Sequence, residues 1–245
     1  MNAAPVLLPG NMCDARLWRG EEGVIVDSLE RRLGRPVYDA DLIRDDSIAA
    51  MAARTLETTS GPLLAIGFSM GAIVAVEMWC QAPERIAGLV LLGYNATADL
   101  PERAAHRPRQ QAAVRAGDLK RVLVDELKPN YLAAAHRDDR VLLDLLCDMG
   151  MALGPKVFVR QSEALRLRAD RRDALARFDI PVLYGCGDED TLCPPDWHRA
   201  WAAQTCGARI ELFPGAGHML PLEAARPLAH TIDRWIADHQ KDLPA

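Results

Sequence analysis

A serine with a glycine two residues away on each side is the first candidate for chemistry in this chain. The stretch AIGFSMGAI, residues 65–73, has the spacing Gly67-x-Ser69-x-Gly71 between apolar runs. Those runs predict a buried strand before Ser69 and a helix after it. A serine on a sharp strand-to-helix turn projects its hydroxyl above the edge of a sheet, where it can attack a carbonyl carbon. A glycine turn that serves packing alone would have the same spacing, so the interpretation depends on other residues.

A serine hydroxyl becomes a strong nucleophile when a base takes its proton and a third group orients the base. Two later loops supply such groups, each directly after a strand-like run: YGCGDEDTLCPP, residues 184–195, and FPGAGHMLPLE, residues 213–223. Because ligands and reacting groups gather at the carboxyl ends of strands in open α/β sheets, both loops are expected near Ser69. His218 is the candidate base. The first loop offers three adjacent carboxylates as the acid: Asp188, Glu189 and Asp190.

The elements that position these residues alternate between strand and helix. Four runs are continuously apolar, as strands buried on both faces are: residues 5–9, 62–68, 86–93 and 180–185. Two runs alternate in polarity and are expected near the sheet edges: residues 35–42 and 208–213. Helical patterns cover about residues 14–33, 46–58 and 70–82, and a last helix starts near Pro227. Strand alternating with helix predicts a parallel, doubly wound sheet.

Residues 99–172 break this alternation. They contain no strand-like run and have the pattern of several short helices rich in arginine and leucine. The chain therefore divides into a core, residues 1–98 and 173–245, and an inserted helical cap. We expect the apolar underside of the cap to cover a pocket and select the substrate, and most cap arginines to face solvent. Candidate underside residues are Leu142, Leu146 and Leu165.

Composition narrows the class of protein. The chain has 245 residues, 49% of them hydrophobic, and a net charge of −5, which argues against nucleic acid as a partner. Its longest apolar stretch, residues 63–76, is shorter than the roughly 20 residues of a membrane span and is interrupted by glycine and serine. The first residues lack the basic region of a signal peptide. We expect no membrane association and a cytoplasmic location.

The six cysteines show no C-x-x-C pairing and indicate neither a disulfide framework nor a zinc site. They are predicted to be reduced packing residues, with Cys193 the most accessible. The remaining histidines lie in charge-rich helical stretches and are expected at the surface: His106, His136, His198, His230 and His239. No metal or organic cofactor is predicted.

Four motifs together resemble those of the α/β-hydrolase family over essentially the whole chain. GFSMG resembles the turn that carries the nucleophile, GDEDTLCP the acid loop G-x-x-D-x-x-x-P, GAGHMLPLE the histidine loop, and LPGNMCDARLW the oxyanion loop. The resemblance implies an α/β-hydrolase fold with a mostly parallel sheet and a helical cap. The family usually has a β-hairpin before the first strand. Here the first strand starts within a few residues of Met1, so a six-stranded sheet without that hairpin is expected.

The resemblance also implies roles for individual residues. Ser69 is the nucleophile and His218 the general base. Alignment of Gly187 and Pro194 with the acid-loop pattern makes Asp190 the orienting acid, with Asp188 as the rival. The backbone N–H groups of two residues form the oxyanion hole: Asn11 and Met70. Pro9 stands where the family usually has a histidine that braces the oxyanion loop.

The activity that the resemblance implies is hydrolysis of a small carboxylic ester through an acyl-enzyme. A lactonase or a C–C bond hydrolase uses the same triad, as do amidases and thioesterases. A slow-turnover ligand-binding or signalling protein of this fold is a further alternative. Tyr94 and Asn95 follow a predicted strand and are expected to line the substrate pocket. Arg160 and Gln161 are candidates to contact a substrate carboxylate. No sequence feature indicates the oligomeric state.

Overall fold

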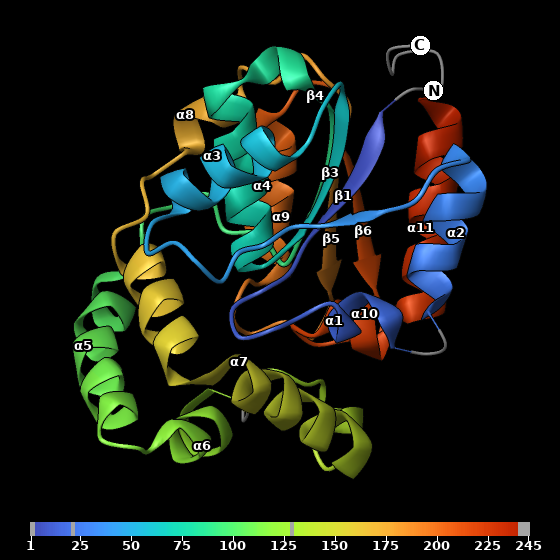
Figure 1. Cartoon of the computed structure of the whole chain (residues 1–245). Helices are drawn as coiled ribbons and strands as arrows, with labels where there is room; N and C mark the ends of the chain where they lie inside the picture. Colours follow the sequence, from blue (N-terminus) through green and yellow to red (C-terminus); the bar gives the residue numbers. More distant parts are fainter. Residues whose placement is uncertain (1–2, 21–22, 128–129, 240–245) are drawn as a thin grey trace.

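A six-stranded parallel sheet forms the centre of the molecule. The computed structural model describes residues 3–20, 23–127 and 130–239. The strand order is β2-β1-β3-β4-β5-β6, and every pair of neighbours runs parallel (Figure 1). The strands are β1 (Ala4–Leu8), β2 (Tyr38–Asp39), β3 (Leu63–Phe68), β4 (Ile86–Leu92), β5 (Val182–Gly187) and β6 (Arg209–Phe213). The six-stranded parallel sheet expected from the sequence is confirmed.

Helices cover both faces of the sheet. In Figure 1, α2 (Val24–Leu33) and α11 (Ala225–Asp238) lie together on one side, and α3 (Ile48–Thr58), α4 (Met70–Gln81) and α9 (Pro195–Gln204) lie on the other. Successive strand residues point to opposite faces, so the sheet has two apolar cores. In β1, Leu7 joins the core under α2 and α11, whereas Val6 and Leu8 join the core under α3 and α4.

The remaining core elements are short. They are α1 (Arg16–Arg19), η2 (Pro83–Arg85), α8 (Arg172–Leu175) and α10 (Leu220–Glu223). The single helix expected over residues 14–33 is therefore two helices, α1 and α2. The alternating run at residues 35–42 contributes two strand residues at one sheet edge, because Pro36 lacks an N–H to donate and the aspartates favour solvent.

A helical insertion between β4 and β5 covers the carboxyl end of the sheet (Figure 1). It contains α5 (Pro101–Arg115), α6 (Leu119–Arg121), η3 (Val122–Leu127), η5 (Ala134–His136) and α7 (Arg140–Arg166). The backbone of α7 breaks at Gly154, where φ is 81°, directly before Pro155. We call this insertion the cap.

Among the helices of the described ranges, none is long and apolar enough to cross a membrane.

The prediction that Cys193 is the most accessible cysteine is wrong: it is buried in the acid loop, and Cys206 is the exposed one.

The turn between β3 and α4 leaves no space for side chains at its two glycines. A Cβ on Gly67 would lie 2.5 Å from Cα of Ala72, and a Cβ on Gly71 would lie 1.9 Å from the carbonyl oxygen of Leu8. Both obstacles are backbone atoms, which cannot rotate away as a side chain can. The glycine spacing that drew attention in the sequence is thus a steric requirement of the turn.

We expect Gly71→Ala to lower the free energy of unfolding by about 3 kcal/mol or more. Overpacking a tight core costs about 1–3 kcal/mol, and here the added Cβ meets backbone atoms that cannot rotate away. Gly61→Ala is the matched control, since φ at Gly61 is +67° and no atom lies within 4 Å of an added Cβ. That change measures backbone strain alone, about 1 kcal/mol. Urea denaturation of both variants tests the expectation, and equal losses of stability would contradict it.

Candidate active site

Ser69, His218 and Asp190 meet at the carboxyl edge of the sheet. Oγ of Ser69 lies 3.0 Å from Nε2 of His218, and Nδ1 of His218 lies 2.8 Å from Oδ2 of Asp190. The three residues follow β3, β6 and β5, so they come from separate loops of one sheet edge. Ser69 is half-buried, whereas the other two side chains are buried. A chain of hydrogen bonds in this order can move a proton from the hydroxyl to the imidazole.

The acid loop directs one of its three carboxylates at the imidazole. Oδ1 of Asp190 accepts hydrogen bonds from the backbone N–H groups of Leu192 and Cys193, both at 2.8 Å. Burial alone would raise the pKa of Asp190, but the His218 charge and hydrogen bond and the Cys193 N–H together hold it below its ordinary value. The carboxylate is therefore ionised and fixed at neutral pH.

The other two carboxylates of the loop bind elsewhere. Asp188 accepts a hydrogen bond from the N–H of Gly215 at 2.8 Å, and Glu189 accepts one from the N–H of Ala134 at 2.8 Å. Asp188 thus braces the loop after β6, and Glu189 ties the acid loop to the cap.

The imidazole of His218 is held by packing as well as by hydrogen bonds. The rings of Phe68 and Tyr131 lie 5.1 Å and 6.0 Å from it, measured between centroids. Behind it, Gly93 has φ of 56°, and a Cβ there would lie 3.1 Å from Cε1 of the imidazole. Tyr131 belongs to the cap, so the cap helps to fix the orientation of this imidazole.

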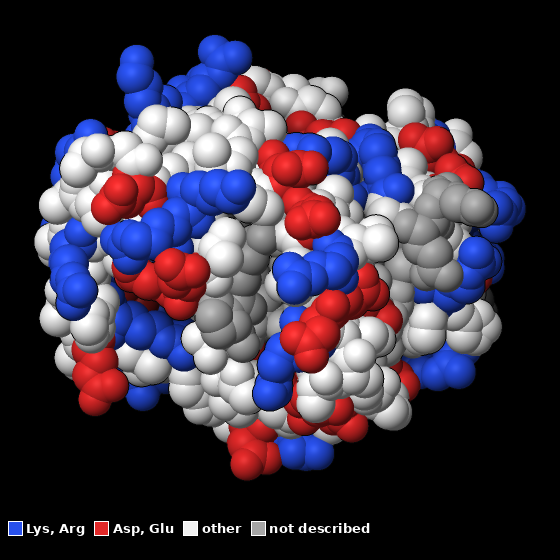
Figure 2. All heavy atoms as spheres, turned by 90° about the horizontal axis from the view of Figure 1, so that it is seen from below, with Lys and Arg blue, Asp and Glu red and all other residues white. Residues whose placement is uncertain are grey.

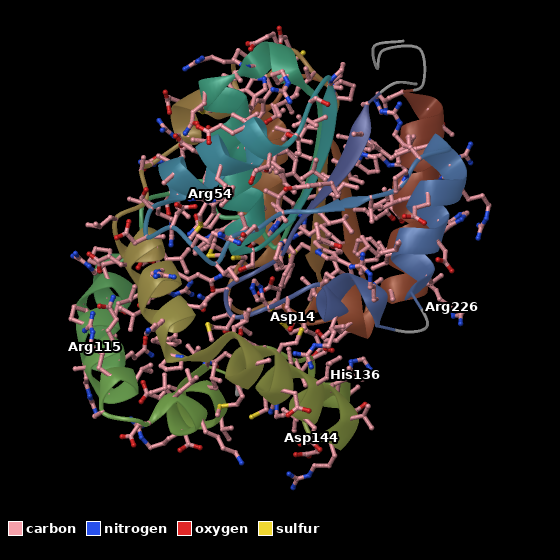
Figure 3. The ribbon with its side chains drawn as sticks, in the orientation of Figure 1. Asp14, Arg54, Arg115, His136, Asp144 and Arg226 are labelled. Atoms are coloured by element: carbon pink, nitrogen blue, oxygen red, sulfur yellow. The ribbon has the colours of Figure 1, made fainter. Side chains whose placement is uncertain are left out.

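Glu223 fixes the histidine loop to the cap, a role that the sequence analysis missed. Its side chain is fully buried, and its carboxylate accepts hydrogen bonds from the N–H groups of Gly217 at 2.9 Å and Ala133 at 2.7 Å. Nδ1 of His136 lies 3.1 Å from the same carboxylate, beside α10 (Figure 3). The signal was present, because this glutamate ends the GAGHMLPLE motif.

The two candidate oxyanion donors, one in the oxyanion loop and one at the start of α4, have backbone N–H groups that the fold does not use. Within the described ranges, the N–H groups of Asn11 and Met70 donate no hydrogen bond to another residue. Met70 is the first residue of α4, where the positive end of the helix dipole favours negative charge. Asn11 and Ser69 line the same cavity.

Gln161 of α7 holds the oxyanion loop. Its side chain is fully buried, and Oε1 accepts hydrogen bonds from the N–H of Met12 at 2.8 Å and from Nδ2 of Asn11 at 3.2 Å. Its Nε2 donates to the carbonyl oxygen of Leu42 at 3.1 Å. Met12 has φ of 55°, a conformation that a non-glycine residue adopts only when it is held there.

Arg160 likewise contacts the segment after β2, since it donates to the carbonyl oxygen of Ile43 at 3.2 Å. The alternative that Arg160 and Gln161 bind a substrate carboxylate is therefore not supported.

His198 is buried, and the prediction that it lies at the surface is wrong. Its Nε2 accepts the N–H of Tyr94 at 2.9 Å, and its Nδ1 lies 3.2 Å from the carbonyl oxygen of Pro194. Burial lowers the pKa of His198 to about 4, so the ring is neutral and donates from Nδ1. The spacing of His198 with the buried Trp201 marks one inward face of α9, a signal that the sequence analysis missed.

A cavity of about 470 Å³ opens above Ser69 and His218. Asn95 lines it, but Tyr94 does not: the Tyr94 ring is buried 6.3 Å from the ring of Tyr184. The expectation that Tyr94 lines the pocket is corrected accordingly.

Leu165 also lines the cavity, whereas Leu142 and Leu146 pack against the core under α2 and α11. The expected cap underside is therefore wrong at those two positions. Most cap arginines were expected to face solvent, and three of them line the cavity: Arg103, Arg107 and Arg168.

No cluster of three or more histidine, cysteine or acidic side chains in the described part of the chain could hold a metal ion.

Comparison with known proteins finds relatives of low sequence identity that match most of this chain. The chain is 26% identical over 196 residues to a pimeloyl-[acyl-carrier protein] methyl ester esterase of Neisseria meningitidis, an alignment that covers 78% of this chain and 75% of the relative. It is 25% identical over 199 residues to a proline iminopeptidase of Lactobacillus helveticus, which covers 72% of this chain and 66% of the relative.

Solved structures share the fold at lower identity. An esterase of Thermogutta terrifontis matches with a TM-score of 0.85 and 21% identity over 100% of this chain and 92% of its own. The enol-lactonase of Burkholderia xenovorans matches with a TM-score of 0.79 and 20% identity over 97% and 92%. The model of the alpha/beta hydrolase family matches residues 6–231. The chain therefore belongs to the alpha/beta hydrolase family.

Proposed function

We propose that this protein is a serine hydrolase that cleaves a small carboxylic ester through an acyl-enzyme. The observation that carries the proposal is the hydrogen-bonded series Ser69–His218–Asp190 at 3.0 Å and 2.8 Å, which opens into a cavity. Esterases among the relatives and structural neighbours support the same reaction class.

In the proposed first half-reaction, Oγ of Ser69 attacks the carbonyl carbon while Nε2 of His218 takes the hydroxyl proton. Asp190 holds Nδ1–H and stabilises the imidazolium that forms. The tetrahedral intermediate collapses when His218 returns the proton to the leaving alkoxide, which departs as an alcohol. The acyl group then remains on Ser69.

In the second half-reaction, water attacks the acyl carbon and gives its proton to His218. The second tetrahedral intermediate releases the carboxylic acid as the proton returns to Ser69. In both intermediates the negative oxygen accepts from the N–H groups of Asn11 and Met70. Such donors act where charge develops, and the loss of one costs about 10²–10³-fold in kcat.

A lactone is an ester within a ring, so the same steps would open it, and the enol-lactonase among the structural neighbours favours lactones as the second substrate class. C–C bond cleavage would need a group that stabilises a carbanion leaving group in place of an alkoxide.

The test is a screen of methyl esters of increasing acyl length, lactones and β-diketones, with Ser69→Ala as the control. We expect turnover of esters above all, and a fall in kcat of about 10⁴–10⁶-fold in Ser69→Ala. Tight binding of these compounds with negligible turnover would instead favour a ligand-binding protein. Turnover that persists in Ser69→Ala would contradict the proposed nucleophile.

A second prediction separates the two candidate acids. Asp190→Asn should lower kcat by about 10³–10⁴-fold with a small change in KM, because the amide favours the wrong imidazole tautomer. Asp188→Asn should lower kcat less than about tenfold, because an amide oxygen still accepts the N–H of Gly215. Steady-state kinetics of both variants decides the matter, and the reverse order would assign the acid to Asp188.

A third prediction concerns the hold of the cap on the oxyanion loop. Gln161→Met keeps the volume of the side chain but removes its three hydrogen bonds, so the N–H of Asn11 loses its fixed direction. We expect kcat to fall about 10–10²-fold with little change in KM, a part of the cost of losing one oxyanion donor.

The affinity for a boronic acid, which mimics the tetrahedral intermediate, should fall by the same factor in Gln161→Met. Gln111→Met is the matched control, because Gln111 is also a buried cap glutamine but bonds Ser162 and Glu163 within the cap. If both variants lose kcat equally, the effect belongs to cap stability and not to the oxyanion loop.

A further inference from the structure

The wall of the cavity formed by α5 is polar throughout. The α5 residues that line it are Glu102, Arg103, His106, Arg107 and Gln110. Their spacing of three and four residues places them along one face of the helix, and that face is turned to the cavity. A pocket for an unsubstituted alkyl ester would be lined by apolar side chains instead, since an apolar ligand cannot replace the water on these groups.

Two of the cavity arginines share one carboxylate. Arg107 donates to both oxygens of Asp99, at 2.5 Å and 3.3 Å, and Arg168 donates to one of them at 2.9 Å; the Asp99 side chain is 1% exposed. This buried group of three carries a net charge of +1. Arg168 also donates to the carbonyl oxygens of Thr97 at 3.0 Å and Ala98 at 3.3 Å, so it is bound on several sides. Arg107 is the member of the group that α5 presents to the cavity.

Arg103 lies one turn before Arg107 and has no carboxylate within ion-pair distance in the described part of the chain. It donates one hydrogen bond, from Nη2 to the carbonyl oxygen of Leu192 at 3.2 Å. The two acidic residues of the wall do not neutralise it. Glu126 is paired with Arg121 at 2.7 Å and accepts from Gln110 at 3.0 Å, and Glu102 is exposed in the first turn of α5.

Apolar side chains also line the cavity. Ile73 comes from α4, Leu165 from α7 and Leu192 from the acid loop, whereas the arginines come from α5 and from the segment just after α7. A ligand that fits both surfaces has a short alkyl chain and a charged end. The face seen in Figure 2 carries acidic and basic side chains side by side. The three arginines are assigned to the cavity wall because they line the cavity.

We propose that the substrate of this site is an ester that carries a second, anionic group, a carboxylate at the far end of a short alkyl chain, and that Arg103 and Arg107 bind that carboxylate. The inference rests on the proposed ester hydrolysis and names its substrate class. Two guanidinium groups one helical turn apart suit a carboxylate, because each offers paired N–H donors to its oxygens. Binding supplies the anion that the cationic wall lacks.

The experiment compares monomethyl esters of linear dicarboxylic acids with neutral methyl alkanoates of equal chain length. At the best length, kcat/KM for the half-ester should exceed that for the neutral ester by about 10–10²-fold, the scale of one or two charge-assisted hydrogen bonds. The preference should shrink as salt is added, because salt screens the charges.

Arg103→Gln should reduce this preference by at least about tenfold, to the part that Arg107 alone supplies. Arg115→Gln is the matched control, because it removes the same charge from the same helix. Arg115 is the last residue of α5 (Figure 3), is exposed and does not line the cavity. It should leave both the preference and the activity on neutral esters unchanged.

A binding measurement separates failure of the subsite from failure of the proposed reaction. In Ser69→Ala protein, calorimetry should give a Kd at least about tenfold lower for the half-ester than for its neutral partner. If esters are not hydrolysed but this difference holds, the reaction is wrong and the subsite stands. Equal kcat/KM and equal Kd at every length, or equal effects of Arg103→Gln and Arg115→Gln, would overturn the subsite.

Discussion

The turn between β3 and α4 is the constraint on which the rest of the site depends. The chain passes from strand to helix through one residue, Ser69, whose φ is 52°. Its N–H is fixed to the carbonyl oxygen of Leu92 in β4 at 2.7 Å, and glycines on both sides admit the close approach of β1 and α4. Strain of this kind persists only where the surroundings hold it. The result is a hydroxyl fixed at the sheet edge where the loops after β5 and β6 end.

Polar contacts join the cap to three of the loops at the site: the oxyanion loop, the acid loop and the histidine loop. Gln161 bonds the oxyanion loop, Glu189 bonds the N–H of Ala134, and Glu223 bonds both the histidine loop and the N–H of Ala133. The side chains of Gln161 and Glu223 are fully buried, so breaking their bonds would leave buried groups without partners, which is costly. The cap therefore does more than cover a pocket, because its contacts help to position His218 and residues 11 and 12.

The sequence predicted best what depends on neighbouring residues. The continuous apolar runs became β1, β3, β4 and β5, and the loops after them hold Ser69 and Asp190 where the motifs placed them. It failed where a partner lies far along the chain. His198 is buried because Tyr94, more than a hundred residues earlier, supplies its hydrogen bond, and Arg168 is buried because Asp99 neutralises it. A charged residue in a helix shows its charge in the sequence, but not whether a distant carboxylate will cover it.

The central claim is that Ser69 is activated by its neighbours and forms the acyl-enzyme. The most direct measurement is mass-spectrometric mapping of the protein after reaction with a fluorophosphonate, which forms a stable bond with an activated serine. The chain has five serines, so the outcome is unambiguous. The account predicts a single adduct, on the peptide that contains Ser69, and its loss in His218→Ala. An adduct on another serine, or ester hydrolysis that continues without any adduct, would contradict it.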